Sequence, residues 1–130
     1  MITVKHLSKT FPSPNGPVYA LKDINLTVEK GELTALIGNS GSGKTTFLNM
    51  IGGLDRPSAG KLFVDGQNLF TKSAHDLVLY KRDTVGFVWQ NNARNLLPHL
   101  TVLENIMFPM QLANSRHKRD RALELLDRVG

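Results

Sequence analysis

The sequence contains no cysteine and no long apolar run, and both absences narrow what the protein can be. Without cysteine, neither a disulfide framework nor a cysteine metal site can form, and such a composition fits a reducing compartment. No apolar run approaches the roughly 18 residues that a membrane-spanning helix needs. The first residues, MITVKHLSK, lack the basic-then-apolar order of a signal peptide. We therefore expect a cytoplasmic protein.

Acidic residues are fewer than basic ones, and the formal net charge is +5. Much of the excess lies in residues 115–121, SRHKRDR, where no aromatic side chain is interleaved to stack on bases. A charge run this short is typical of a solvated helix face, so we expect no nucleic-acid partner. The histidines are scattered without the spacing of metal ligands. They are His6, His75, His99 and His117.

The strand signals fall into two kinds. Residues 2–7 and 19–29 alternate apolar and polar side chains, as half-buried strands do, and the proline-rich residues 11–17 separate them. In contrast, ELTALIG at 32–38 and TVGFVWQ at 84–90 are nearly continuous apolar runs, which suit strands covered on both faces of a parallel sheet. The sequence therefore predicts antiparallel strands that lead into a partial parallel sheet.

Local signals predict the remaining elements. Asp65-Gly66 is a strong hairpin turn signal within residues 61–69. Thr101 and Glu104 fit a capping box at the start of a helix that we expect Pro109 to end. Apolar residues at helical spacing predict three further helices, over 45–51 with Gly52-Gly53 as its end, over 73–83, and over 115–129.

Residues 38–45, GNSGSGKT, match the phosphate-loop pattern G-x-x-x-x-G-K-[ST] in full. The motif follows an apolar run and opens a predicted helix, which is the context it requires. Gly38, Gly41 and Gly43 allow the backbone to curl so that N–H groups point at an anion, including those of Asn39, Ser40 and Ser42. The following helix adds unpaired N–H groups and the positive end of its dipole.

The side chains after the loop extend this chemistry to a nucleoside triphosphate. Lys44 supplies a cation for the β- and γ-phosphates. The hydroxyl of Thr45 can enter the octahedral shell of Mg²⁺, which bridges those phosphates. Thr46 offers a second hydroxyl near the α-phosphate. The sequence therefore predicts a site for ATP and Mg²⁺, although the motif alone leaves several NTPase classes open.

Two longer stretches resemble the ATP-binding subunit of ABC transporters. They are GKTTFLNMIGGLDRPSAGKLFVDGQNL, and VGFVWQNNARNLLPHLTVLENI, which is similar to the family's Q-loop region. The resemblance covers residues 2–129 and is nearest to the branch of lipoprotein release and macrolide export. It implies an α/β fold with a P-loop NTPase-type partial parallel sheet, an antiparallel β subdomain and the start of an α-helical subdomain. We expect residues 1–90 to form the nucleotide-binding core and 91–130 the beginning of a truncated helical subdomain.

The resemblance also implies roles for single residues. Gln90 matches the Q-loop glutamine, which contacts Mg²⁺ or orients water and joins Lys44 as a catalytic residue. Phe11 lies where the family keeps an aromatic residue against adenine, with Tyr19 as a weaker rival because its strand context suggests packing. Trp89 replaces the more usual phenylalanine and is expected in the core.

The implied partners are a transmembrane permease subunit and a second copy of the same domain, at the inner face of the cell membrane. In the family, the region after Gln90 docks a cytoplasmic helix of the permease; here it contains the apolar residues Leu96, Leu97, Leu100, Leu103, Ile106, Met107 and Met110. The LSGGQ-like signature, the Walker B strand and the catalytic glutamate have no counterpart in this sequence. We therefore expect a fragment without hydrolysis, with open edges that favour an edge-paired or domain-swapped homodimer.

Two other functions fit the same residues. One is a nucleotide-binding regulatory module that never hydrolyses ATP, and the other is an ABC-type ATPase without a membrane partner. A GTPase is disfavoured because no N-K-x-D motif is present. The transported substrate leaves no trace in this sequence, because in the resembled family it contacts the membrane subunit.

Overall fold

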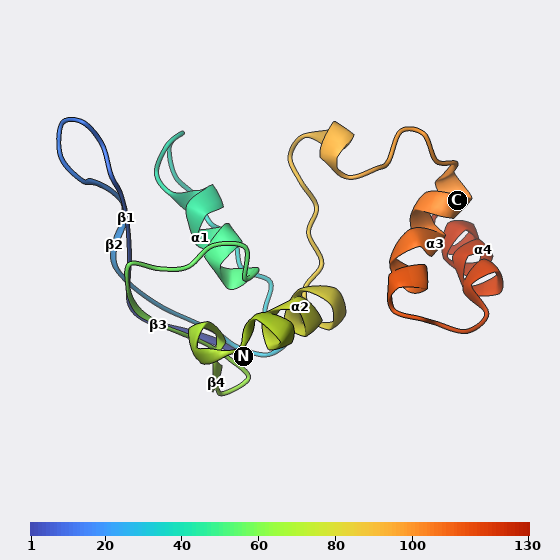
Figure 1. Cartoon of the computed structure of the whole chain (residues 1–130), viewed down its shortest axis with the longest axis horizontal. Coiled ribbons are helices and arrows are strands. Elements are labelled where there is room, and N and C mark those ends of the chain that lie inside the picture. Colours follow the sequence, from blue (N-terminus) through green and yellow to red (C-terminus); the bar gives the residue numbers. More distant parts are fainter. The chain divides into compact units, whose positions relative to one another are not determined.

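The computed structural model describes residues 1–130, apart from the side chain of Asn92. The chain divides into two compact units, Met1–Val85 and Gly86–Gly130 (Figure 1). None of the helices in the described chain is both long enough and apolar enough to cross a lipid bilayer.

The first unit is built on a four-stranded antiparallel sheet of order β2-β1-β3-β4. The strands are β1 Ile2–Phe11, β2 Val18–Val28, β3 Ala59–Val64 and β4 Gln67–Asn68. The alternating segments of the sequence are therefore strands, as predicted. Asp65 and Gly66 join β3 to β4 with φ angles of 47° and 78°, the left-handed values that a two-residue hairpin turn requires.

Two helices complete this unit, α1 Lys44–Ile51 and α2 Ala74–Asp83, with a short 3₁₀ turn η1 at Leu69–Thr71. Helix α1 ends at Ile51, with Gly52 as its C-cap and Gly53 next at φ 70°, which confirms the predicted glycine end. The hydroxyl of Ser73 accepts a hydrogen bond from the backbone of Asp76 and caps α2.

The core lies between the sheet and these helices. Strands β1 and β3 contribute Leu7 and Leu62, and α1 contributes Met50, all three fully buried. From α2, Tyr80 is buried and its hydroxyl donates a 2.7 Å hydrogen bond to the carbonyl oxygen of Ile51. Burial raises the pKa of this hydroxyl. The sheet, α1 and α2 therefore share one core, and the hydroxyl of Tyr80, the polar group among its side chains, has a hydrogen-bond partner.

The predicted parallel sheet is wrong for this chain. Residues 32–37 and 85–89 form no strand, and Leu33, Ile37 and Val88 are 99%, 94% and 91% exposed. A strand persists only where a neighbour takes up its N–H and C=O groups. Among the described residues, neither segment lies beside another strand, and the N–H and C=O groups of Trp89 pair with the side chain of Asn95 instead. The fold is mixed α/β, and its sheet is antiparallel throughout.

The second unit contains η2 Asn92–Arg94, α3 Val102–Leu112 and α4 Lys118–Val129, of which α3 and α4 contact each other. The capping box of α3 is confirmed: the hydroxyl of Thr101 accepts from the backbone of Glu104, whose carboxylate accepts from the backbone of Thr101 at 2.7 Å. The backbone N–H and the hydroxyl of Thr101 both donate to this carboxylate and lower the pKa of Glu104. Pro109 lies inside α3 and does not end it: its missing N–H removes a single hydrogen bond, and its carbonyl oxygen still accepts from the N–H of Ala113 at 3.0 Å.

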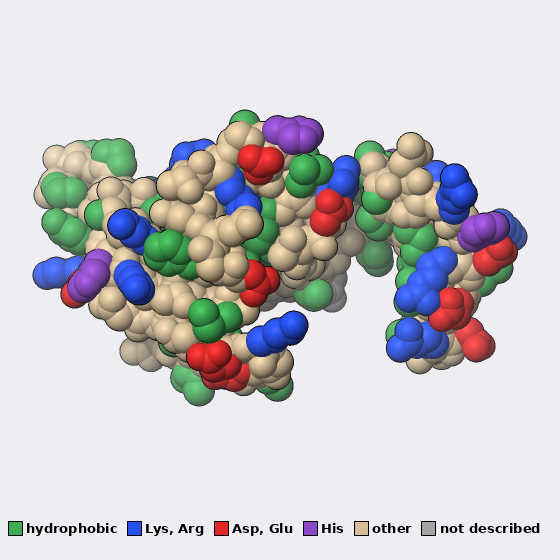
Figure 2. All heavy atoms as spheres, turned by 90° about the horizontal axis from the view of Figure 1, so that it is seen from below, with side chains coloured by type: hydrophobic (Ala, Val, Ile, Leu, Met, Phe, Trp, Pro, Cys, Tyr) green, Lys and Arg blue, Asp and Glu red, His purple; other side chains and the backbone are tan. Residues whose placement is uncertain are grey.

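The basic run at 115–121 overlaps the start of α4. Arg121 pairs with Glu124 at 2.6 Å, and both side chains are about half exposed. Figure 2 shows Lys, Arg, Asp and Glu side chains interspersed on the visible face of this C-terminal unit. The run therefore forms a solvated helix face of mixed charge. Before α3, the Trp89 ring stacks on that of Phe87 with centroids 5.1 Å apart.

Candidate functional site: a phosphate loop at one end of the first hairpin

The residues of the phosphate-loop motif lead directly into α1. Gly41 and Gly43 have φ angles of 78° and 88°, in the region that glycine enters without steric cost. Gly43 is also the N-cap of α1, and no side chain caps this end of the helix. The N–H groups of the first turn are therefore available to an anion, and the helix dipole favours negative charge at this point.

Gly43 attaches the loop to the sheet. A Cβ atom at Gly43 would collide with the carbonyl oxygen of Ala20 and would lie 2.8 Å from Cδ2 of Leu21. At Gly38, a Cβ would lie 2.7 Å from Oγ of Ser42, whereas at Gly41 it would meet nothing within 4 Å. The downstream end of the loop is therefore packed on β2, and the middle of the loop is open.

Lys44 folds back over the loop. Its Nζ donates hydrogen bonds to the carbonyl oxygens of Gly38 and Asn39, both at 2.7 Å, and to Oγ of Ser42 at 3.2 Å. In the described part of the chain no carboxylate pairs with this ammonium group. All three of its acceptors are neutral, so its positive charge is not neutralised at the mouth of the loop. This arrangement fits an anionic ligand.

A cavity of about 340 Å³ adjoins the loop. Its polar side is formed by Gly38, Ser42, Gly43 and Lys44, and its apolar side includes Phe47 of α1. The other lining residues are Leu21, Ile24, Asn25 and Leu26 of β2, with Leu36 and Ile37. The predicted phosphate-binding residues thus border a cavity, although its apolar wall includes part of the segment that forms no strand.

Phe11 ends β1 and lies opposite Val18, two residues before the Ala20 against which Gly43 packs. The structure therefore brings Phe11 and the phosphate loop to the same end of the β1–β2 hairpin. The Phe11 side chain is 43% exposed, so its ring is accessible to a ligand. Tyr19, the rival residue, is also exposed. Its strand context suggests packing into the core, which the structure does not show.

The remaining candidate residues are less closely grouped. Thr45 is exposed and Thr46 half-buried in the first turn of α1. Gln90 is exposed in the second compact unit. No three His, Cys, Asp or Glu side chains in the described chain could together hold a metal ion. A single hydroxyl at Thr45 fits Mg²⁺, which is commonly bound through few protein groups and the phosphates of the nucleotide.

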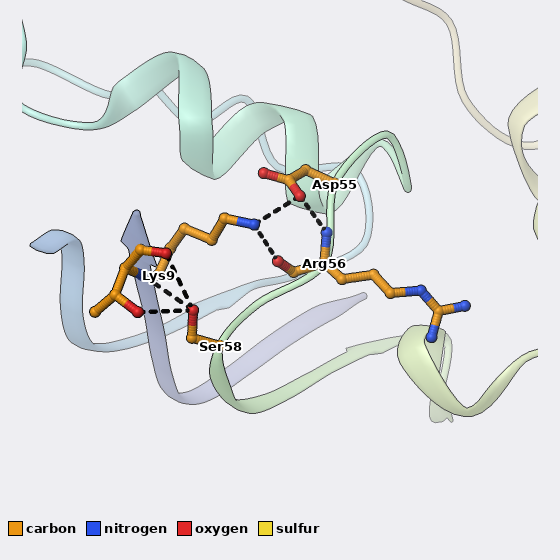
Figure 3. A network of polar contacts seen from close by, with 5 residues as sticks. Lys9, Asp55, Arg56 and Ser58 are labelled. Carbon is orange, nitrogen blue, oxygen red and sulfur yellow. Dashed lines mark hydrogen bonds and ion pairs between the residues drawn. The ribbon is translucent and has the colours of Figure 1, made fainter. Parts of the chain in front are cut away.

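Sequence reasoning missed a polar network that joins β1 to the loop after α1 through Lys9, Asp55, Arg56 and Ser58 (Figure 3). Nζ of Lys9 donates to Oδ1 of Asp55 and to the carbonyl oxygen of Arg56, both at 2.7 Å. Oγ of Ser58 accepts from the backbone N–H of Thr10 at 3.0 Å. The hydrogen bond from Lys9 lowers the pKa of Asp55. The available signal was the spacing of Lys9 and Phe11, since residues two apart in a strand share one face.

In a comparison with known protein families, residues 21–130 match the sequence model of the ABC transporter family. The chain is 41% identical to the lipoprotein-releasing system ATP-binding protein LolD 1 of Rhodopirellula baltica, covering the whole chain and 57% of that protein. It is 38% identical to the macrolide export ATP-binding/permease protein MacB of a Shewanella species, again over the whole chain, which is 20% of MacB. The lipoprotein-release and macrolide-export branches predicted from the sequence are thus both among its relatives.

A solved structure of an ATP-binding cassette also matches the chain. The ATP-binding cassette MJ0796 of Methanocaldococcus jannaschii, in a dimeric post-hydrolysis state bound to ADP and Pi, superposes with a TM-score of 0.86 at 38% identity. The match covers 98% of the present chain and 56% of the cassette. The chain therefore spans little more than half the length of LolD 1 and of MJ0796.

Proposed function

The chain belongs to the ABC transporter family, as part of its ATP-binding domain, and from this premise we propose that it binds ATP and Mg²⁺ within a subunit that couples ATP hydrolysis to transport. The observation that carries the proposal is the open start of α1, where uncapped N–H groups and the ammonium of Lys44 converge on one loop. Phosphate is the ligand that such a site favours.

The proposed roles follow the geometry of the loop. Residues 38–46 hold the phosphates through backbone N–H groups, with Lys44 offsetting the charge of the outer phosphates. Phe11 stacks on the adenine ring. Thr45 and Gln90 are the proposed Mg²⁺ ligands, and Lys44 and Gln90 the catalytic residues. When bound, Mg²⁺ neutralises phosphate charge during phosphoryl transfer.

We further propose how these residues are organised in the whole subunit. Residues 1–90 would form the nucleotide-binding core and 91–130 the start of a helical subdomain that contacts a transmembrane permease at the inner face of the membrane. A second copy is the other proposed partner, and the dimeric state of the MJ0796 cassette supports it. Light scattering that shows only monomer at high concentration, with or without ATP, would contradict self-association of this chain.

We propose that the 130 residues bind nucleotide without turning it over. Hydrolysis needs a residue that positions or deprotonates the attacking water. In the resembled family that residue is a glutamate directly after a Walker B aspartate, and the sequence contains no apolar strand followed by an aspartate and a glutamate. Steady phosphate release from this chain, abolished by Lys44→Ala, would refute that part of the proposal. Co-purification of the complete subunit with a membrane protein would separate a transporter from a soluble ATPase of the same family.

The direct test of binding is a titration of ATP with Mg²⁺ that follows the melting temperature, with Lys44→Ala as the control. Ligand at about 100 times its Kd should stabilise the folded chain by about 2.7 kcal/mol. A rise in melting temperature that disappears in Lys44→Ala supports the proposed site. An equal rise in both proteins, or none in either, contradicts it.

A further inference from the structure

We propose that Lys9 is a positioning residue for Phe11, and that it makes the free face of this ring a stacking surface for the base of the nucleotide. The inference rests on the proposed function, since it assigns a role within the same ATP site. Neither the phosphate-loop motif nor the resemblance to the family points to Lys9.

The ammonium group of Lys9 is held in one place. Its side chain is only 13% exposed, which is uncommon for lysine. Its three donors have three partners: the carboxylate of Asp55, the carbonyl oxygen of Arg56 and the face of the Phe11 ring. A largely desolvated cation with these partners stays fixed, because any other position would leave one of its N–H groups unpaired and the Asp55 carboxylate with only the Arg56 backbone N–H.

This cation covers one face of the Phe11 ring. Nζ lies 5.0 Å from the ring centroid, within the range of a cation–π contact. A base can therefore stack only on the opposite face, and the exposure of Phe11 leaves room for it. Because the ammonium draws on the electron density of the ring, it should also favour stacking with the electron-rich adenine ring.

The same contacts connect the ring to the phosphate-binding helix. Asp55 and Arg56 lie in the loop that follows α1, only a few residues beyond its end at Ile51. Lys9 therefore joins the strand end that carries Phe11 to the helix whose first turn carries the phosphate loop (Figure 3). Base and phosphate subsites would share one rigid frame, in which Lys9 affects recognition of the base and not of the phosphates.

The experiment compares two probes, ATP and inorganic tripolyphosphate, each titrated with Mg²⁺ into the same variants of the 130-residue chain. Lys9→Met should weaken ATP binding by about threefold to tenfold and leave tripolyphosphate binding unchanged. Phe11→Ala should have at least as large an effect on ATP. In the Phe11→Ala background, Lys9→Met should cause no further loss, because Lys9 acts through the ring.

The matched control is Lys22→Met. Nζ of Lys22 lies 5.9 Å from the centroid of the Tyr19 ring, on an exposed part of β2. The Lys22→Met substitution therefore removes a contact of the same kind that lies outside the Lys9–Asp55–Arg56 network. We expect no change in the ratio of the two dissociation constants. Asp55→Asn serves as a second variant if Lys9→Met does not fold, and it should weaken ATP selectively but less.

The outcomes separate the inference from the function on which it rests. Equal losses for ATP and tripolyphosphate in Lys9→Met, or an additional loss in the Phe11→Ala background, would overturn the role of Lys9 while the ATP site stands. If the wild type binds neither probe, or if Lys44→Ala binds both as well as the wild type, the proposed function fails and takes the inference with it.

Discussion

Strand β1 and the segment 32–37 are both rich in apolar side chains, yet Val4 and Leu7 of β1 are buried while Leu33 and Ile37 are almost fully exposed. The difference lies in their neighbours. Strand β1 pairs with β2 across a short loop and with β3 on its other edge. The segment 32–37 has no strand partner among the described residues. Apolar composition therefore yields a strand only where hydrogen-bonding partners also exist.

The second unit repeats the contrast. Helix α3 is completed by contacts between residues three apart, Thr101 and Glu104, which need no distant partner. Residues 86–89 form no strand, although the N–H and C=O groups of Trp89 pair locally with the side chain of Asn95, because no strand lies beside them among the described residues. Strands form where a partner strand is present, whether next in sequence, as β2 is for β1, or far along the chain, as β3 is for β1. The segments 32–37 and 85–89 have no partner strand among the described residues and form none.

The largest expected effect compares the same substitution in the two regions. Leu7→Ala should lower the free energy of unfolding by about 2–5 kcal/mol, because it opens a cavity in the core. Leu33→Ala should change it by less than about 0.5 kcal/mol, because the side chain is already in water. Urea unfolding followed by far-UV circular dichroism measures both. Comparable losses would mean that residues 32–37 are buried in solution.

The next effect compares the downstream end of the phosphate loop with its middle. Gly43→Ala should cost about 1–3 kcal/mol and reduce ATP binding, because the new Cβ collides with Ala20 at a left-handed φ angle. Gly41→Ala shares the unfavourable φ angle but meets no atom, so its cost should stay near 1 kcal/mol. Melting temperatures rank the two variants, and the reverse order would show that the loop is not packed on β2.

A smaller effect tests the local hydrogen bonds that cap α3 in the second unit. Thr101→Ala removes the cap of α3 and should cost about 1 kcal/mol. Trp89 is the single tryptophan and belongs to this unit, so its fluorescence should report the loss while the dichroism of the sheet does not change. Thr101→Ser retains the hydroxyl and is the matched control. A loss shared by both signals would mean that the two units unfold together.

The smallest effect concerns the long-range pair of Lys9 and Asp55. Its hydrogen bond lowers the pKa of Asp55 from the ordinary value of 3.8, so the ionised carboxylate stabilises the fold above that value. This contribution is lost as the pH falls through the lowered pKa. The wild type should therefore lose its stability advantage over Asp55→Asn between pH 5 and pH 2, as judged by urea midpoints. Asp127→Asn, an exposed carboxylate of α4, is the control, and parallel pH profiles for all three proteins would exclude the pair as a contributor.

Much of the fold was predictable because its signals are short-range. The alternation in β1 and β2, the turn at Asp65-Gly66 and the capping box at Thr101 each depend on residues close together in the sequence. Pro109 was misjudged because a proline in a helix removes a single N–H, and the helix continues where the other hydrogen bonds, such as that from Ala113 to the Pro109 carbonyl, are made. The prediction of a parallel sheet was wrong because the sequence of one segment shows its apolar side chains but not whether a partner strand lies beside it.

The sequence by itself determined the family, the phosphate-loop residues and the elements that close on themselves, because these depend on residue type and near-neighbour spacing. Only the tertiary structure decided that Gly43 packs on Ala20, that the Lys44 ammonium folds over its own loop, and that Lys9 joins Phe11 to the end of α1. In each of these contacts, the two groups are separated either by several freely rotating bonds or by many residues of the chain. Their distances are therefore set by packing and not by sequence spacing.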